Sequence, residues 1–164
     1  MPNTLSVRSR FRWRTLDDEV YLADGSEVDF SAARRLFILI HGYNTSQEDA
    51  QRAFGKFRRR VGGSLPRREL WDFHWPDDHP KALLSKLSYP VRVPQAQSTG
   101  NRLAVFLARL PNTVSVTLIA HQLAFTSNFA QTFARLLRPE MTSADRTRPS
   151  LRLLMSSDRA THGA

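Results

Sequence analysis

The chain contains no cysteine. This absence excludes disulfide bonds, thiolate nucleophiles and cysteine-ligated metals, and it leaves the redox compartment open. The sequence also lacks an apolar run of about 18 residues, so we expect no membrane-spanning helix. The arginine-rich start of the chain has none of the apolar stretch that is typical of a secretory signal. A cytoplasmic location is therefore the default expectation.

Acidic residues are scarce relative to basic ones. The 164 residues include 24 Lys and Arg against 15 Asp and Glu, which gives a formal net charge of +9. Such a surplus favours contact with nucleic acid or an acidic partner. It is also typical of a solvated, arginine-rich surface, and we favour this second interpretation because basic composition alone carries no specificity.

Hydrophobic patterning predicts alternating strands and helices. The expected strands span residues 6–14, 19–22, 36–40, 69–75, 114–120 and 151–155, and the expected helices span 45–60, 98–110 and 124–137. Thr45 or Ser46 would cap the first helix, and Gly62-Gly63 would end it. The second helix has an apolar stripe of Leu103, Val105, Phe106, Leu107 and Leu110. Because prolines punctuate residues 77–94, we interpret that stretch as an irregular loop with one short helix near 81–87. The alternation predicts a single domain over residues 1–164 of the α/β class. We expect three layers, with a mostly parallel sheet of about six strands and helices on both faces.

Ligand sites in such sheets lie at the carboxyl ends of the strands. Three predicted strand ends carry notable motifs: His41-Gly42-Tyr43-Asn44, Trp75-Pro76, and the strand–turn–helix around His121-Gln122-Leu123. Together they resemble the small bacterial α/β-hydrolases with a His-Gly-Tyr-Asn or His-Gly-Phe-Asn turn, over roughly residues 12–155. The resemblance implies an incomplete α/β-hydrolase fold that lacks its C-terminal strand–helix units. It also implies ester hydrolysis of a small-molecule ester or acyl substrate, with no cofactor and no metal.

The resemblance assigns roles to individual residues. Gln122 stands at the position of the nucleophilic serine, at the nucleophile elbow. The backbone amides of Tyr43 and Leu123 would stabilise the oxyanion, with His41 and Gly42 forming the first turn of the pocket. A carboxamide has no ionisable proton at neutral pH and is a very poor nucleophile. We therefore expect the protein to be catalytically impaired or inactive.

Other candidates are weaker. Asp158 follows the last expected strand and is the candidate acid of a triad, whereas His162 lies in a short polar tail and the expected catalytic histidine is missing. We expect His41 and His121 to make structural hydrogen bonds. The substitute nucleophiles Ser127 and Thr126 lie off the turn, and a cluster of potential metal ligands has no specific spacing: His74, Asp77, Asp78 and His79.

Two further expectations concern partners. The strand at 151–155 would form an exposed sheet edge, so we expect either pairing of two copies as a homodimer or poor solubility. The alternative function is a non-enzymatic binding module that uses a basic surface for nucleic acid or an acidic partner. In that case the four arginines of residues 8–14, which alternate with other residues, would share one face of a strand.

Overall fold

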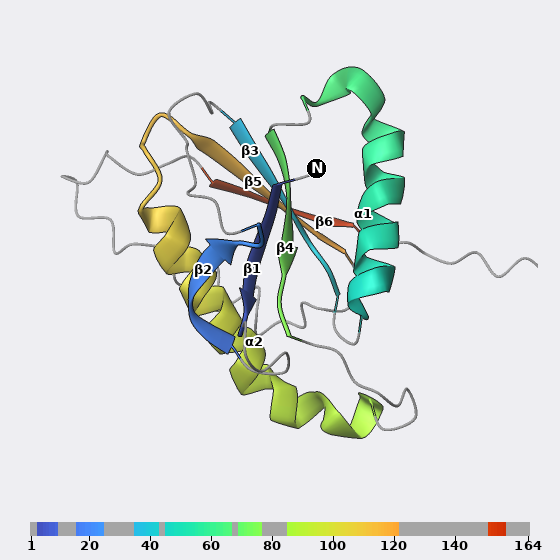
Figure 1. Cartoon of the computed structure of the whole chain (residues 1–164), viewed down its shortest axis with the longest axis vertical. Coiled ribbons are helices and arrows are strands. Elements are labelled where there is room, and N and C mark those ends of the chain that lie inside the picture. The colour runs from blue at the N-terminus through green and yellow to red at the C-terminus, as the bar shows by residue number, and fades with distance from the viewer. Residues whose placement is uncertain are drawn as a thin grey trace, which may run out of the picture.

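Residues 36–40, the apolar run that ends at His41, lie at the centre of a β-sheet. The strand that contains them, β3, has β4 on one side and β5 on the other, and the full strand order is β2-β1-β4-β3-β5-β6. Figure 1 shows these strands in a computed structural model. The model describes residues 3–9, 16–24, 35–42, 45–66, 69–76, 85–121 and 151–156.

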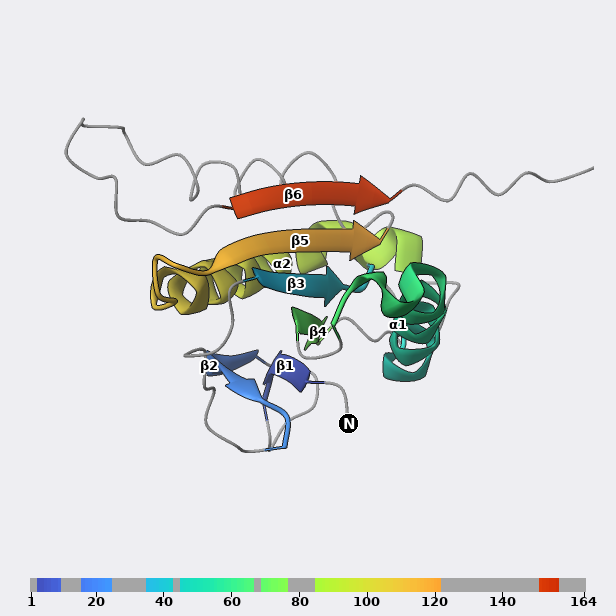
Figure 2. The ribbon, with the colours of Figure 1, turned by 90° about the horizontal axis from the view of Figure 1, so that it is seen from above.

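The described elements alternate between strands and helices after an initial hairpin. Their bounds are β1 Asn3–Arg8, β2 Leu16–Leu22, β3 Arg35–Ile40, α1 Gln47–Val61, the 3₁₀ turn η1 Gly62–Ser64, β4 Leu70–His74, α2 Ser85–Ala108, β5 Ser115–His121 and β6 Leu151–Ser156. Only the β1–β2 pairing is antiparallel among the paired strands that the structure describes. Figure 2 shows β3, β5 and β6 running in the same direction. The prediction of an α/β protein with a mostly parallel sheet is therefore confirmed.

Side chains of β3 alternate between two apolar clusters, one for each face of the sheet. Leu36, Ile38 and Ile40 belong to a cluster that includes Leu103 and Leu107 of α2. Phe37 and Leu39 belong to the other cluster, with Ala50 and Phe54 of α1. Because successive strand residues point to opposite faces, α1 and α2 cover opposite sides of the sheet. We call these sides the α1 face and the α2 face.

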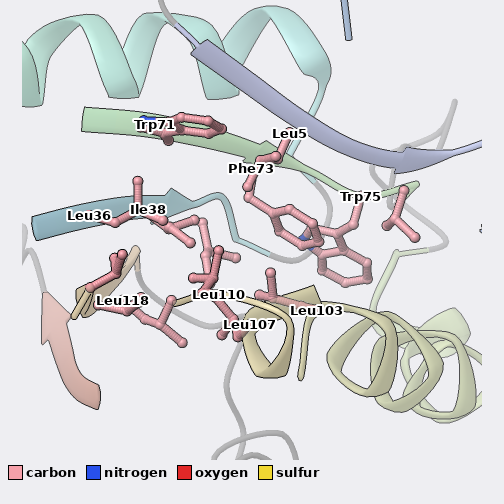
Figure 3. Packing of buried hydrophobic residues seen from close by; sticks show 14 of the residues in the cluster. Leu5, Leu36, Ile38, Trp71, Phe73, Trp75, Leu103, Leu107, Leu110 and Leu118 are labelled. Carbon is pink, nitrogen blue, oxygen red and sulfur yellow. The ribbon is translucent and has the colours of Figure 1, made fainter. Parts of the chain in front are cut away.

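The α2 face carries the larger apolar cluster. Its buried members come from β1, β2, β3, β4, β5 and α2, and Figure 3 shows Phe73, Ile38 and Leu118 around the leucines of α2. The expected inner positions Leu103, Leu107 and Leu110 are buried. Val105, however, is 53% exposed, so its inclusion in the predicted apolar stripe is wrong.

Helix α1 begins and ends at the residues that its sequence indicates. The Ser46 hydroxyl accepts a hydrogen bond from the Asp49 amide at 3.1 Å and donates one to the Asp49 carboxylate at 2.7 Å. The helix ends at Gly62, which has a φ of 52° and donates its amide hydrogen to the carbonyl of Arg58. Only glycine adopts that conformation at low cost. Thr45 and Ser46 were both candidate caps, and the structure assigns the role to Ser46.

Helix α2 differs most from the prediction. It starts at Ser85 and continues through Pro90 and Pro94, where an irregular loop was expected. A proline removes one backbone hydrogen bond and kinks a helix, but packing can hold the helix together across it. Figure 1 shows α2 bending along its course. No helix in the described part of the chain is long and apolar enough to span a membrane.

The hairpin also differs in its limits. Strand β1 begins at Asn3, earlier than expected, and β2 begins at Leu16 rather than Glu19. Strand β1 lies between β2 and β4 and not at an edge, and its residues Leu5, Ser6 and Val7 are all buried. Residues 10–15 lie outside the described residues, and with them three of the four arginines predicted to share one strand face.

Candidate functional site at the carboxyl edge of the sheet

The carboxyl ends of β4, β3 and β5 lie next to one another. Ile40 pairs with Phe73 on one side and with Ala120 on the other, and Ala120 pairs with Met155 of β6. The chain leaves β3 toward β4 but leaves β5 toward β6, on the opposite side. In open α/β sheets, ligands bind beyond the carboxyl ends of the two strands at which the direction changes in this way. The described residues at these two strand ends are His41-Gly42 and the His121 backbone.

His41 joins the end of β3 to the end of β4. It is 1% exposed, and its Nε2 atom lies 3.2 Å from the backbone nitrogen of Trp75. The Trp75 N–H is a donor, so Nε2 must accept, which leaves the ring proton on Nδ1. Nδ1 lies 3.0 Å from the Gly42 carbonyl oxygen and donates to it. Both ring nitrogens of His41 are thus used in backbone hydrogen bonds, as expected of a structural histidine.

Trp75 completes a reciprocal pair of contacts with His41. Its indole Nε1–H donates to the His41 carbonyl oxygen at 3.2 Å, and the two rings stack with centroids 5.7 Å apart and an interplanar angle of 14°. We call this arrangement the His41–Trp75 clip. It fixes the backbone at Gly42. A neutral His41 held in this way cannot act as a general base without breaking the clip.

A column of rings continues from the clip along the α1 face. The His74 ring lies 5.6 Å from the His41 ring, and the Phe54 ring of α1 meets His74 edge-on at 5.5 Å. Phe54 is also part of the apolar cluster on this face. Helix α1 therefore packs against both the sheet and the candidate site, so the position of the helix and the geometry of the strand ends depend on each other.

An ion pair lies under the same helix. The Arg58 guanidinium of α1 donates a hydrogen bond to the Asp72 carboxylate of β4, and the side chains are 25% and 4% exposed, respectively. Burial raises the pKa of the Asp72 carboxyl above its ordinary value, and the Arg58 hydrogen bond and charge oppose that rise. Desolvation is the larger effect, as is common for a carboxylate inside a protein.

The structure describes only part of the predicted site. His41 and Gly42 follow the end of β3, and His121 ends β5. The nucleophile position Gln122, the amides of Tyr43 and Leu123, and the candidate acid Asp158 lie outside the described residues, as do Thr126, Ser127 and His162. Asp77, Asp78 and His79 also lie outside them. Within the described ranges, no three His, Asp or Glu side chains are arranged to hold a metal ion.

Sequence reasoning missed three contributors to this region: Trp75 as the partner of His41, and the pair Arg58 and Asp72. The signal for the pair was present, because Asp72 interrupts an otherwise apolar strand and a buried carboxylate needs a partner. The strand order and the pairing define an α/β protein with a mostly parallel sheet. No family model, no curated protein and no solved structure matches the chain.

Proposed function

We propose that this chain is an α/β-hydrolase-like protein, related to serine ester hydrolases, in which Gln122 replaces the nucleophile and leaves little or no catalytic activity. The register of β3 with β5 carries the proposal. Ile40 pairs with Ala120, so that neighbouring strands end at His41-Gly42 and at His121. The turns that the resemblance assigns to the oxyanion site, at Tyr43 and Leu123, follow these ends directly in the sequence.

The His41–Trp75 clip supports the binding half of this proposal. An oxyanion site acts by holding backbone N–H groups in place before charge develops, so its donors need a rigid backbone. The clip fixes Gly42 through the bond from His41 Nδ1 to the Gly42 carbonyl. The amide of Tyr43 comes next in the chain and would be one of the two donors. His41 is thus a positioning residue in the proposed site.

Gln122 supports the catalytic half of the proposal. The reaction would require a side chain that attacks the ester carbonyl and later leaves, and a neutral carboxamide does neither. The site would still accommodate a small ester or acyl compound through its backbone donors. We propose that the protein retains this binding ability without turnover.

The test compares the unmodified chain with Gln122→Ser and with Gln122→Ala, the matched control. Hydrolysis of short p-nitrophenyl esters is measured with and without imidazole, which supplies an external base. We expect Gln122→Ser with imidazole to hydrolyse esters about 100-fold faster than Gln122→Ala, because only the serine hydroxyl can attack the ester carbonyl and an assisting base contributes about that factor. Only the serine variant should take a fluorophosphonate label.

Two outcomes would overturn the proposal. Turnover by the unmodified chain that Gln122→Ala abolishes would show that the wild-type site is catalytic. No gain in Gln122→Ser with imidazole, together with no fluorophosphonate label on that variant, would show that no hydrolase-type site exists there. Adding His41→Leu to Gln122→Ser should lower kcat with little change in KM, since the clip positions a group that acts in the transition state.

We also propose that two copies pair through β6. This strand lies at one end of the strand order and pairs with β5 along its inner edge. Unpaired strand edges attract further strands, and charged residues on an edge prevent such pairing. Sedimentation of the unmodified chain beside Leu153→Lys should show a dimer that the variant loses. A monomer at all concentrations of the unmodified chain would exclude the dimer.

A further inference from the structure

The exposed side of α1 carries a row of cations: Arg52, Lys56, Arg59 and Arg60. We call this row the α1 cation surface. All four side chains are exposed. Their spacing of four, three and one residues keeps them on one side of a helix, and the rise of 1.5 Å per residue spreads them over about 12 Å. Figure 1 shows α1 at the right-hand flank of the sheet.

No acidic residue of α1 compensates the positive charge that Lys56, Arg59 and Arg60 carry in the C-terminal half of the helix. The acidic residues of α1, Glu48 and Asp49, stand in the first turn. Asp49 binds Arg52 at 2.7 Å. No acidic residue follows Asp49 in the helix, so Lys56, Arg59 and Arg60 have no anionic neighbour along it.

The orientation of the surface is fixed by a contact on the other side of the helix. Arg58 points inward to Asp72 of β4, and Phe54 packs into the apolar cluster beneath α1. Rotation of the helix would break both contacts. The row of cations is therefore held toward solvent by the fold itself, and it does not depend on the conformation of a loop.

The helix dipole accounts for two of the four cations. Cations in the last turn of a helix interact favourably with its dipole, and Arg59 and Arg60 lie there.

The dipole does not account for Gly55, which lies between these basic residues. Glycine inside a helix lowers stability. A Cβ atom at Gly55 would meet one atom within 4 Å, Arg59 Nη1 at 3.7 Å, which is ordinary contact. Internal packing therefore does not require glycine there, whereas close approach by a ligand would.

We infer that the α1 cation surface binds the phosphate backbone of a nucleic acid, with a phosphate seated over Gly55 between the basic side chains. Guanidinium groups bind phosphate oxygens through paired N–H donors, and a regular row of cations suits a regular row of phosphates. The row contains no aromatic side chain to stack on a base, so the contacts are independent of nucleotide sequence. The net charge of +9 strengthens attraction to a long polyanion.

This surface is separate from the proposed ester site. Three of the four cations, Lys56, Arg59 and Arg60, occupy the half of α1 that leads toward β4, whereas the other end of the helix follows His41-Gly42. The inference therefore does not depend on the proposed function, and either can fail without the other.

The experiment measures binding of fluorescent single-stranded and duplex oligonucleotides of mixed sequence by anisotropy, from about 50 to about 200 mM salt. The test variant is Lys56→Gln/Arg60→Gln. The matched control is Arg35→Gln/Arg109→Gln, which removes the same charge from exposed arginines on β3 and after α2. We expect about tenfold weaker binding for the test variant at low salt, because it loses two exposed charge contacts, each of which makes a modest contribution. Its salt dependence should be shallower by about 1.4 to 1.8 in log–log slope.

The outcomes distinguish binding by the α1 cation surface from general attraction by the net charge of the chain. An equal loss in the control would overturn the inference, because the two variants have the same charge. Competition by polyglutamate as effective as that by the oligonucleotides would also overturn it, in favour of an acidic protein partner. The single-stranded and duplex arms tell which form supplies the phosphates. Gly55→Ala should weaken binding about threefold while the helix stays intact by circular dichroism, and unchanged binding would remove Gly55 from the site.

Discussion

The two faces of the sheet are stabilised in different ways. The α2 face joins side chains from β1, β2, β3, β4, β5 and α2 in one large apolar cluster. On the α1 face the apolar cluster is smaller, and buried ionisable groups lie beside it: His41, Asp72 and His74. Burial of apolar surface stabilises a fold without regard to direction, whereas hydrogen bonds and ion pairs fix geometry. The α2 face therefore has most of the apolar burial, whereas the α1 face positions the strand ends.

The largest effect should come from the α2 face. Phe73 is fully buried among the apolar side chains that Figure 3 shows, so Phe73→Ala removes a ring that the surroundings cannot replace. We expect a loss of about 4–5 kcal/mol in the free energy of unfolding, measured in urea. Phe54→Ala, on the α1 face, should cost about 3 kcal/mol. A larger loss for Phe54→Ala than for Phe73→Ala would mean that the α1 face contributes more to stability than the α2 face.

The second effect concerns the ion pair of the α1 face. Arg58→Met leaves the Asp72 carboxylate buried without its cation, and we expect a loss of about 3 kcal/mol at neutral pH. The loss should shrink on acidification, because the protonated carboxyl needs no cation. The double variant Arg58→Met/Asp72→Asn should recover most of the stability. No recovery would show that Arg58 acts through packing of its aliphatic part.

The same carboxyl gives a pH dependence whose sign follows from burial. Because the pKa of Asp72 is raised above its ordinary value of 3.8, the folded chain keeps this proton to higher pH than the unfolded chain does. Its contribution to stability is therefore greatest below pH 3.8 and falls as pH rises through the folded-state pKa. Urea unfolding across this range, beside Asp72→Asn, should show the unmodified chain losing stability relative to the variant as pH rises. The opposite slope would mean that Arg58 outweighs desolvation.

A third effect tests the clip. His41→Leu removes the acceptor of the Trp75 N–H and leaves a buried donor unsatisfied, which costs about 2 kcal/mol. Trp75 fluorescence should shift as the stacked ring is lost. His41→Gln offers an amide in place of the ring and should recover part of the stability. Equal losses in both variants would indicate that ring packing, and not hydrogen bonding, is what matters at this position.

The smallest effect should be a gain. Gly55→Ala places a methyl group in ordinary contact with Arg59 and lowers the conformational freedom of the unfolded chain. We expect about 0.7 kcal/mol of added stability, measured by thermal or urea unfolding. A loss of stability would mean that Gly55 serves the packing of the helix and would weaken the case for a ligand there.

Local patterns predicted the parts of the fold that depend on neighbouring residues. The apolar run before His41, the cap at Ser46 and the stop at Gly62 each specify their element through short-range chemistry, and the structure confirms them. The prolines at 90 and 94 misled the prediction, since their local cost is outweighed in the folded chain by packing of the rest of α2. The strand order could not be predicted, because β4 lies between β1 and β3 for reasons that involve residues far apart in sequence.

In the candidate site, too, short-range patterns predicted local features, but they did not predict contacts between residues far apart in the sequence. The motif around His41 indicated a strand end with structural hydrogen bonds, but not their partner, since Trp75 is separated from it by a whole helix. The Arg58–Asp72 pair could have been suspected from an acidic residue in an apolar strand, yet α1 contains several arginines. Only the rotation of the helix, set by Ala50 and Phe54 on its buried side, selects Arg58.

The position of β3 at the centre of the sheet has a consequence for synthesis. As the chain leaves the ribosome, β3 emerges before either strand that will flank it, and its pairing with β5 must await residues 115–121. Strand β4 can pair with one edge of β3 once residues 70–74 have emerged, but the other edge stays open until β5 follows, and that pairing is long-range and slow to form. We therefore expect nascent chains that end before β5 to expose the apolar run 36–40 and to be prone to aggregation.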